Sequence, residues 1–209
     1  MTKNILIAGA TGKTGRILTQ QLIDQGQTVT ALVRESSDTS QLPEATSLRQ
    51  ADLTNLQSDD CDGADVVVFA AGSGGTTGPD MTDKVDRDGA MRLIDLAKEA
   101  GVERFVMLSS IGADQSNPSG EMAHYLQAKH DADEHLKASG LTYAIIRPVA
   151  LNDDGRSEKM VLGSEVDIAA QASRADVAQV LASAAITGQF DGKALNMQSS
   201  GEALSAVLS

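Results

Sequence analysis

A turn with regularly spaced glycines, between an apolar run and a helical pattern, most constrains the fold of this chain. Residues 5–15 read I-L-I-A-G-A-T-G-K-T-G, in which four apolar residues precede Gly9, Gly12 and Gly15. Four apolar residues in a row suit a strand that is buried on both faces of a parallel sheet. Apolar residues at helical spacing, beginning at Ile17, predict a helix directly after the turn. The order of strand, glycine turn and helix is the context that a dinucleotide-binding fingerprint requires.

The chemistry of phosphate binding gives a reason for glycines in this turn. A pyrophosphate binds against backbone N–H groups at a helix N-terminus, where the helix dipole favours negative charge. A Cβ atom in the turn would hold the phosphates away from the backbone. The spacing here is G-x-x-G-x-x-G and not G-x-G-x-x-G, and a tight turn that binds no ligand is the alternative interpretation. The residues predicted to contact the phosphates are Gly9, Thr11, Gly12, Lys13, Thr14 and Gly15.

Apolar strands alternate with amphipathic helices along the rest of the chain. Strands are predicted at residues 28–34, 47–53, 64–71, 104–109, 141–147 and 193–198, and helices at residues 81–100, 121–139 and 175–186. This alternation predicts an α/β fold with a Rossmann-like, doubly wound, mostly parallel sheet of about seven strands and helices on both faces. At 209 residues we expect one domain, in which residues after about 148 add a small substrate-side region. Residues 72–79 and 152–165 are expected to be loops.

Composition argues against several classes of partner. The net charge of −12 argues against a nucleic-acid or anionic-membrane surface, which needs clustered Lys and Arg. No apolar run of about 18 residues exists, so no membrane span is expected. The chain enters its first strand without a signal peptide, and Cys61 is its single cysteine, so we expect a reducing, cytoplasmic setting. His124, His130 and His135 are poorly spaced for metal binding, and no metal site is expected.

Basic residues near the turn favour NADP over NAD. Ligands of doubly wound sheets bind beyond the carboxyl ends of the strands, and an NAD-binding unit usually has an acid after its second strand. This chain has Arg34 there, whose guanidinium suits a 2′-phosphate, and Lys13 adds a second positive charge. Glu35 keeps NAD as the less favoured alternative, and Asp52 is expected either to bind adenine or to form a turn. The cofactor contacts expected at strand ends are Arg34, Asp52, Leu53, Ala70, Ala71, Gly72, Ser109 and Pro148.

One predicted helix carries a pair of residues suited to proton transfer. Tyr125 and Lys129 stand four residues apart, so a helix places them on one face. A neighbouring ammonium stabilises a phenolate and makes a tyrosine a competent acid or base for a carbonyl or carbinol oxygen. Ser109 and Ser110 end the preceding strand, and their hydroxyls could bind the same oxygen. The alternative for the Tyr–Lys pair is an exposed helix pair without catalytic function.

Seven segments together resemble the short-chain dehydrogenase/reductase superfamily. They are G-A-T-G-K-T-G at 9–15, A-D-L at 51–53, F-A-A-G at 69–72, L-S-S-I-G at 108–112, Y-L-Q-A-K at 125–129, I-I-R-P at 145–148 and S-R-A-D-V-A at 173–178. The resemblance is to its small atypical members, the single-domain NAD(P)-binding proteins called sugar-epimerase-like. It implies that Ser110 orients the substrate, that Tyr125 transfers the proton, and that Lys129 binds the nicotinamide ribose and favours the phenolate.

The expected function is that of an NAD(P)H-dependent oxidoreductase, with NADP as cofactor and a small carbonyl, quinone or flavin-type substrate. Extended relatives have Asn where this chain has Asp86, and about sixty residues after Pro148 do not suit a full nucleotide-sugar pocket. The alternatives are a non-catalytic dinucleotide sensor, a type that generally lacks the Tyr and Lys, and an epimerase or dehydratase with tightly bound NAD. The resemblance also leaves open a homodimer through the helices at 81–100 and 121–139.

Overall fold

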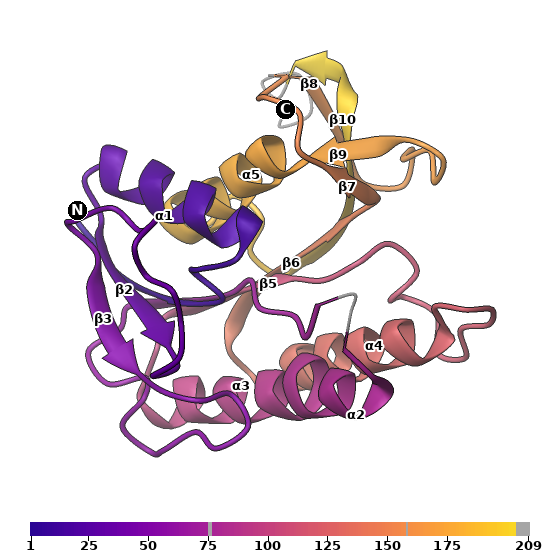
Figure 1. The fold of residues 1–209 in the computed structure, drawn as a ribbon. Helices are drawn as coiled ribbons and strands as arrows, with labels where there is room; N and C mark the ends of the chain where they lie inside the picture. The colour runs from indigo at the N-terminus through magenta and orange to yellow at the C-terminus, as the bar shows by residue number, and fades with distance from the viewer. Residues whose placement is uncertain (75–76, 158, 204–209) are drawn as a thin grey trace.

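An eight-stranded sheet forms the centre of the molecule, in the order β3-β2-β1-β4-β5-β6-β10-β8 (Figure 1). The computed structural model describes residues 1–74, 77–157 and 159–203. Every pair of neighbouring strands is parallel except β10 and β8, which are antiparallel. β7 and β9 form a separate two-stranded parallel sheet. The strands are β1 (Asn4–Ala8), β2 (Thr28–Val33), β3 (Ser47–Gln50), β4 (Val66–Phe69), β5 (Arg104–Leu108), β6 (Thr142–Pro148), β7 (Ala150–Asn152), β8 (Lys159–Leu162), β9 (Gln171–Ser173) and β10 (Lys193–Ala203).

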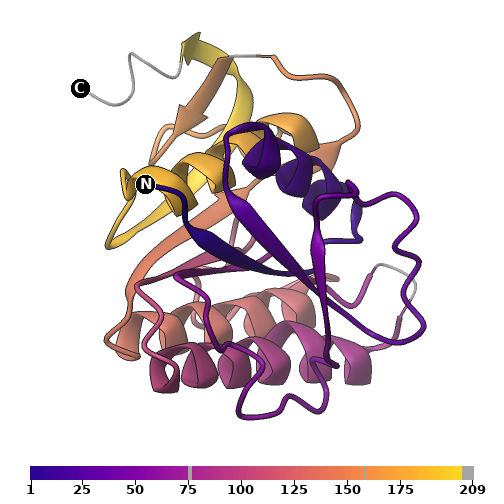
Figure 2. The ribbon, with the colours of Figure 1, turned by 90° about the vertical axis from the view of Figure 1, so that its left-hand side faces the viewer.

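Helices cover both faces of this sheet (Figures 1 and 2). Ile5 and Ile7 of β1 belong to the apolar core beneath α1 and α5, whereas Leu6 belongs to the core beneath α3 and α4. The apolar run at the start of the chain is therefore buried on both faces, as predicted. The helices are α1 (Lys13–Asp24) and α5 (Arg174–Thr187) on one face, and α2 (Pro79–Thr82), the π-helix η1 (Asp83–Gly89), α3 (Ala90–Glu99) and α4 (Ala123–Ala138) on the other.

The predicted Rossmann-like fold class is confirmed, with one difference in the number of strands of its sheet. The sheet has eight strands and not about seven, because segment 152–165, expected to be a loop, contains β8. Met160 of β8 is buried against the core on the α1–α5 side, which explains why a mostly polar segment adds an edge strand. Residue 158 of this segment and residues 75–76 of the predicted loop 72–79 lie outside the described residues. In the described part of the chain, no helix is long and apolar enough to cross a membrane.

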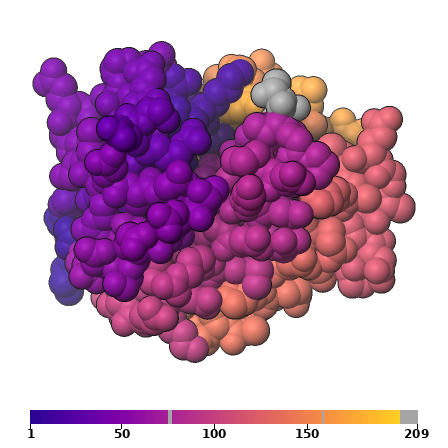
Figure 3. Space-filling model, turned by 60° about the horizontal axis from the view of Figure 1, so that its bottom comes forward, coloured from indigo at the N-terminus to yellow at the C-terminus, as the bar shows by residue number. Residues whose placement is uncertain are grey.

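The helix predicted at 81–100 is a run of three segments, α2, η1 and α3. The π-helical turn η1 lies in its middle, and π-helical insertions occur often at functional sites. At the end of η1, a Cβ atom on Gly89 would lie 2.8 Å from the carbonyl oxygen of Leu53, so the glycine allows the helix to pack closely against the loop after β3. Figure 3 shows this face, where the purple N-terminal third of the chain meets the magenta helices.

Candidate functional site

The parallel strands bring the predicted cofactor contacts to one edge of the sheet. β1 to β6 run parallel, so their carboxyl ends share that edge. The glycine turn follows β1, and the other predicted positions follow or end β2, β3, β4, β5 and β6. The strand ends thus carry Gly9, Thr11, Gly12, Lys13, Thr14, Gly15, Arg34, Asp52, Leu53, Ala70, Ala71, Gly72, Ser109 and Pro148.

Two glycines of the turn are required by the packing of the protein itself. Gly9 has a φ of +88°, and a Cβ there would lie 2.5 Å from the backbone nitrogen of Ala71. A Cβ on Gly15 would lie 2.0 Å from the carbonyl oxygen of Gly9. Both contacts are with backbone atoms, which cannot move aside as a flexible side chain can. Gly9 and Gly15 therefore allow the backbone of the turn to pack closely against neighbouring backbone, and this packing requires glycine whether or not a ligand binds.

Gly12 has no comparable reason to be glycine. It is exposed, its φ of −72° and ψ of 165° suit any residue, and a Cβ there would meet only the carbonyl oxygen of Gly9, at 3.3 Å. Gly12 is also the N-cap of α1, and as a glycine it has no side chain that could accept a hydrogen bond from the N–H groups of the first turn. The first N–H groups of a helix have no acceptor within it. An open glycine before these donors fits the close approach of a pyrophosphate.

Alanine at these positions should separate ligand binding from folding. We expect Gly12→Ala to leave the melting temperature unchanged and to weaken dinucleotide binding by about tenfold or more, because its Cβ occupies the face that phosphates approach. Gly15→Ala is the matched control and should destabilise the protein by about 1–3 kcal/mol, because its Cβ overlaps backbone. Calorimetric titration and thermal unfolding of both variants measure these effects. Unchanged dinucleotide affinity in Gly12→Ala would contradict this assignment.

The basic residues predicted for the 2′-phosphate are both exposed. Arg34 follows β2 directly, and Lys13 opens α1, where its Nζ lies 2.6 Å from Oδ2 of Asp153. Asp52 forms a turn, since its Oδ1 accepts hydrogen bonds from the backbone N and Oγ1 of Thr54, both at 2.8 Å. These hydrogen bonds and the charge of Arg34 lower the pKa of Asp52. Asp52 Oδ1 thus takes the turn-forming role that the sequence left open.

Tyr125 and Lys129 lie together on α4, beside a buried carboxylate. Lys129 Nζ lies 5.7 Å from the centre of the Tyr125 ring and 5.7 Å from that of Phe69. Its side chain is 3% exposed, whereas Tyr125 is partly exposed. Nζ also lies 3.0 Å from Oδ1 of the fully buried Asp86, whose Oδ2 accepts a hydrogen bond from the backbone N of Ser73. The arrangement is a phenol at the surface with a buried ion pair behind it.

The acidic neighbours keep the buried lysine charged. Burial alone would lower the pKa of Lys129, but its electrostatic interactions with Tyr125, Asp86 and Asp133 outweigh burial and raise this pKa above its ordinary value. An ammonium held in this state near a tyrosine ring favours the phenolate. Asp86 stands where extended relatives have Asn, and here it supplies the counter-charge that lets Lys129 remain buried.

A second buried network lies below the ends of β5 and β6. Oδ2 of Asp133 accepts a hydrogen bond from Oγ of Ser109 and one from Nε of Arg147, both at 2.9 Å. Burial raises the pKa of Asp133, against the opposing effects of Arg147 and Ser109. Sequence reasoning missed this network. One signal was present, because Asp133 continues the four-residue spacing of Tyr125 and Lys129 on the same helix.

The two adjacent serines differ in what their hydroxyls contact. Ser109 is buried, and its hydroxyl is committed to Asp133. Ser110 is partly exposed, and its Oγ donates only a long hydrogen bond, 3.3 Å, to the carbonyl oxygen of Ile111. Of the pair, Ser110 has the hydroxyl that a substrate oxygen could engage, because the Ser109 hydroxyl donates to Asp133 and the Ser109 backbone N donates to the carbonyl oxygen of Ile146 at 2.8 Å.

The remaining candidate residues are engaged in structural contacts. Burial and the nearby Asp60 carboxylate raise the pKa of the Cys61 thiol to about 12, so it is not a nucleophile at neutral pH. His124 pairs with Asp83 at 3.0 Å, His135 with Asp95 at 2.7 Å, and His130 with the carbonyl of Ala113 at 2.9 Å. Among the described residues, no three His, Cys, Asp or Glu side chains are grouped to hold a metal ion.

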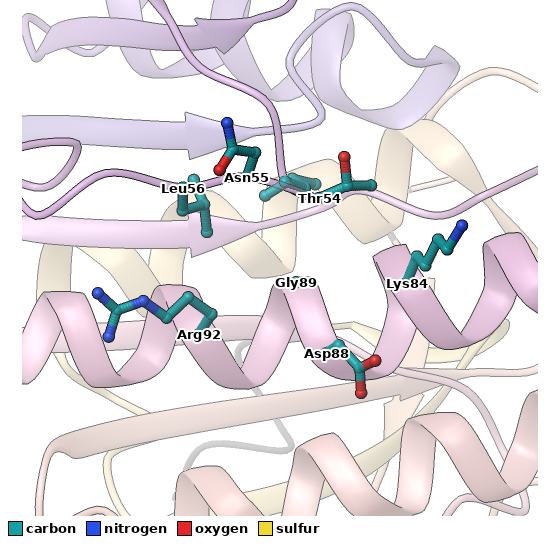
Figure 4. Close-up of a pocket in the computed structure, with 8 residues that line it drawn as sticks. Thr54, Asn55, Leu56, Lys84, Asp88, Gly89 and Arg92 are labelled. Carbon is teal, nitrogen blue, oxygen red and sulfur yellow. The ribbon is translucent and has the colours of Figure 1, made fainter.

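A groove of about 500 Å³ borders the adenine end of the predicted cofactor cleft. Figure 4 shows Thr54, Asn55 and Leu56 in the loop after β3, which runs alongside the helix that carries Lys84, Gly89 and Arg92. The full lining is Leu53, Thr54, Asn55, Leu56, Lys84, Asp88, Gly89 and Arg92. This lining includes Leu53, one of the predicted cofactor contacts, and does not include Tyr125 or Lys129.

Comparisons with known proteins match both the turn and the fold. The sequence profile of the family described as NAD(P)H-binding matches residues 9–187. The uncharacterized sugar epimerase YhfK of Bacillus subtilis is 38% identical over 158 residues, which cover 72% of this chain and 73% of YhfK. A Bacillus halodurans structure, provisionally named an NAD-dependent epimerase/dehydratase, has a TM-score of 0.92 and 33% identity, covering 99% of this chain and 98% of that one. The oxidoreductase ylbE of Lactococcus lactis has a TM-score of 0.85 and 28% identity, covering 98% and 94%.

Proposed function

We propose, from the premise that this chain belongs to the NAD(P)H-binding family, that it is an NADPH-dependent oxidoreductase acting on a small carbonyl, quinone or flavin-type substrate. The observation that carries the proposal is the partly exposed Tyr125 with the charged Lys129 buried behind it. A sensor that only binds a dinucleotide does not need a proton donor such as a phenol beside an ion pair. The glycine turn supports the binding half of the proposal, since Gly12 is left open in front of the N–H groups of α1.

The choice of NADP rests on the two cations at the edge of the sheet. Arg34 and Lys13 are both exposed, one after β2 and the other at the first position of α1. A guanidinium and an ammonium are donors suited to a 2′-phosphate dianion. Glu35, directly after Arg34, could still bind a ribose 2′-hydroxyl as the acid of an NAD site does. The less favoured alternative is NAD.

Each residue of the candidate catalytic group has a separate task in this proposal. The reduced nicotinamide supplies the hydride when the cofactor is bound. Tyr125 donates a proton to the substrate oxygen as negative charge develops there. The Ser110 hydroxyl donates a hydrogen bond to the same oxygen. Lys129, held by Asp86, stabilises the phenolate that remains, and its predicted contact with the nicotinamide ribose is part of the proposal.

The second candidate function is that of an epimerase or dehydratase with tightly bound NAD. The names of the Bacillus subtilis and Bacillus halodurans relatives favour it. It would use the same tyrosine as an acid or base but return the hydride to its substrate. The observation against it is the small region after β6, which consists of short strands, α5 and β10.

A substrate panel separates these functions. NADPH oxidation would be followed with quinones, free flavins, aldehydes and ketones, at matched concentrations of enzyme. We expect turnover with at least one of these classes, and slower turnover with NADH. Tight NADPH binding without turnover on any class would favour the sensor. NAD released from the purified protein on heating, without net NADPH oxidation, would favour the epimerase or dehydratase.

A further inference from the structure

A second groove, of about 580 Å³, lies beside the N-terminal turn of α1. Three cations, Lys13, Arg16 and Arg174, line it in a protein whose net charge is −12. They come from two helices that are far apart in the sequence, since Lys13 and Arg16 belong to α1 and Arg174 begins α5. Two carboxylates of the segment after β7 complete the charged part of the lining, together with amide and apolar side chains. The other lining residues are Ile17, Gln20, Gln21, Gln41, Pro43, Asp153 and Asp154.

Asp153 bridges two of these cations. Its Oδ2 lies 2.6 Å from Nζ of Lys13, and its Oδ1 lies 2.6 Å from Nη1 of Arg174. The hydrogen bond from Lys13 and the charge of Arg174 lower the pKa of Asp153, so the carboxylate is ionised at neutral pH. Lys13 and Asp153 are 61% and 60% exposed, which leaves both within reach of a ligand. The one ammonium of the glycine turn is therefore occupied by an internal carboxylate.

The segment that carries Asp153 is fixed to the body of the protein on both sides. Before it, the side-chain amide of Asn152 donates to Oε1 of Gln171 at 2.9 Å. After it, the backbone N of Ser157 donates to Oδ1 of the fully buried Asp176 at 3.0 Å, and the Ser157 hydroxyl donates to Oδ2. These anchors hold Asp153 beside Lys13.

We propose that Asp153 is a specificity-determining residue, which competes with the 2′-phosphate of NADPH for Lys13 and so weakens NADPH binding without affecting NADH. This inference rests on the proposed use of NADPH. A 2′-phosphate dianion can replace a carboxylate on the ammonium, because both bind it by charge-assisted hydrogen bonds. NADH has only a neutral 2′-hydroxyl at that position, which cannot replace a carboxylate on the ammonium, so the Lys13–Asp153 bridge stays intact when NADH binds. Arg174 retains the displaced carboxylate near the turn.

The neighbouring Asp154 provides a matched control. It lines the same groove and carries the same charge, but its Oδ2 accepts a hydrogen bond from the Asn152 amide at 2.7 Å and no cation of the described residues lies within ion-pair distance of it. Asp153→Asn and Asp154→Asn remove the same formal charge one residue apart. If the lost charge acted only through the general electrostatic field, the two variants would change NADPH affinity nearly equally. Competition for Lys13 would change NADPH affinity only in Asp153→Asn.

Calorimetric titration of NADPH and NADH into the wild-type protein and both variants tests the proposal. Asp153→Asn is expected to bind NADPH about two- to fivefold more tightly and NADH with unchanged affinity, as an exposed ion pair of ordinary strength implies. Asp154→Asn is expected to bind both dinucleotides with wild-type affinity. In the double variant Lys13→Met/Asp153→Asn, the gain in NADPH affinity is expected to disappear, because the ammonium for which Asp153 competes is absent. Unchanged NADPH affinity in Asp153→Asn, or an equal gain for NADPH and NADH, would overturn it.

The same titrations distinguish failure of this inference from failure of the proposed function. A wild-type protein that binds neither dinucleotide contradicts the proposed oxidoreductase, whatever the variants do. A wild-type protein that binds NADPH and oxidises it with a substrate, but whose Asp153→Asn variant is unchanged, contradicts the competition alone.

Discussion

Replacement of Tyr125 by phenylalanine is expected to lower kcat for NADPH oxidation by about 10²- to 10⁴-fold, the usual contribution of a positioned general acid. The substitution removes one hydroxyl from a partly exposed side chain and leaves the ring beside Lys129 in place. Binding of NADPH and the melting temperature should therefore stay close to those of the wild type. Steady-state kinetics with the best substrate of the panel, together with titration of NADPH, measure the two quantities separately.

The only other tyrosine of the chain supplies the matched control. Tyr143 is near the start of β6, at the opposite end of that strand from Pro148, and packs against the core on the α3–α4 side. Tyr143→Phe removes the same atom far from the edge where the site residues meet, and it should keep full activity. Equal activity in Tyr125→Phe and the wild type would refute the role of Tyr125 as proton donor.

Removal of the Asp86 carboxylate should have the largest effect on stability. Asp86 is fully buried, and Lys129 Nζ lies 3.0 Å from its Oδ1. Asp86→Ala leaves a buried ammonium without its nearest partner, which is expected to lower the free energy of unfolding by about 3–5 kcal/mol. Urea denaturation at neutral pH measures this loss.

Asp88, two residues along the same helical run, is the control for this substitution. It forms an exposed ion pair with Arg87 at 2.7 Å, and Asp88→Ala should change the free energy of unfolding by about 1 kcal/mol or less. Replacing both buried partners, in Asp86→Leu/Lys129→Met, should recover much of the stability lost in Asp86→Ala, because no unpaired charge remains buried. Equal losses in Asp86→Ala and Asp88→Ala would show that the buried pair has no special importance.

Features that follow from local patterns could be predicted from the sequence. The apolar run before Gly9 predicts a strand buried on both faces, and the spacing of Tyr125 and Lys129 predicts that they share a helix face; the structure has both. Parallel topology then places the strand ends together, because each crossover returns the chain to the same edge. This logic locates a cleft without any knowledge of individual side-chain contacts.

Features that depend on contacts between distant segments could not be predicted in this way. Asp153 lies 140 residues from Lys13 in the sequence, and nothing in either segment indicates that they pair. The strand β8 was missed because its alternation is weak and its place beside β10 is fixed by one buried side chain, Met160. The commitment of Ser109 to Asp133 depends on the packing of α4 against β5, which no periodicity encodes.

We propose that the open glycine turn at the start of α1 binds a reduced dinucleotide. Isothermal titration of NADPH and of NADH into the wild-type protein, at low salt and neutral pH, tests it most directly. We expect saturable binding of both dinucleotides at one site per chain, with NADPH bound more tightly, and binding weakened by about tenfold or more in Gly12→Ala. The absence of any binding heat with either dinucleotide, in a protein that unfolds cooperatively, would contradict it.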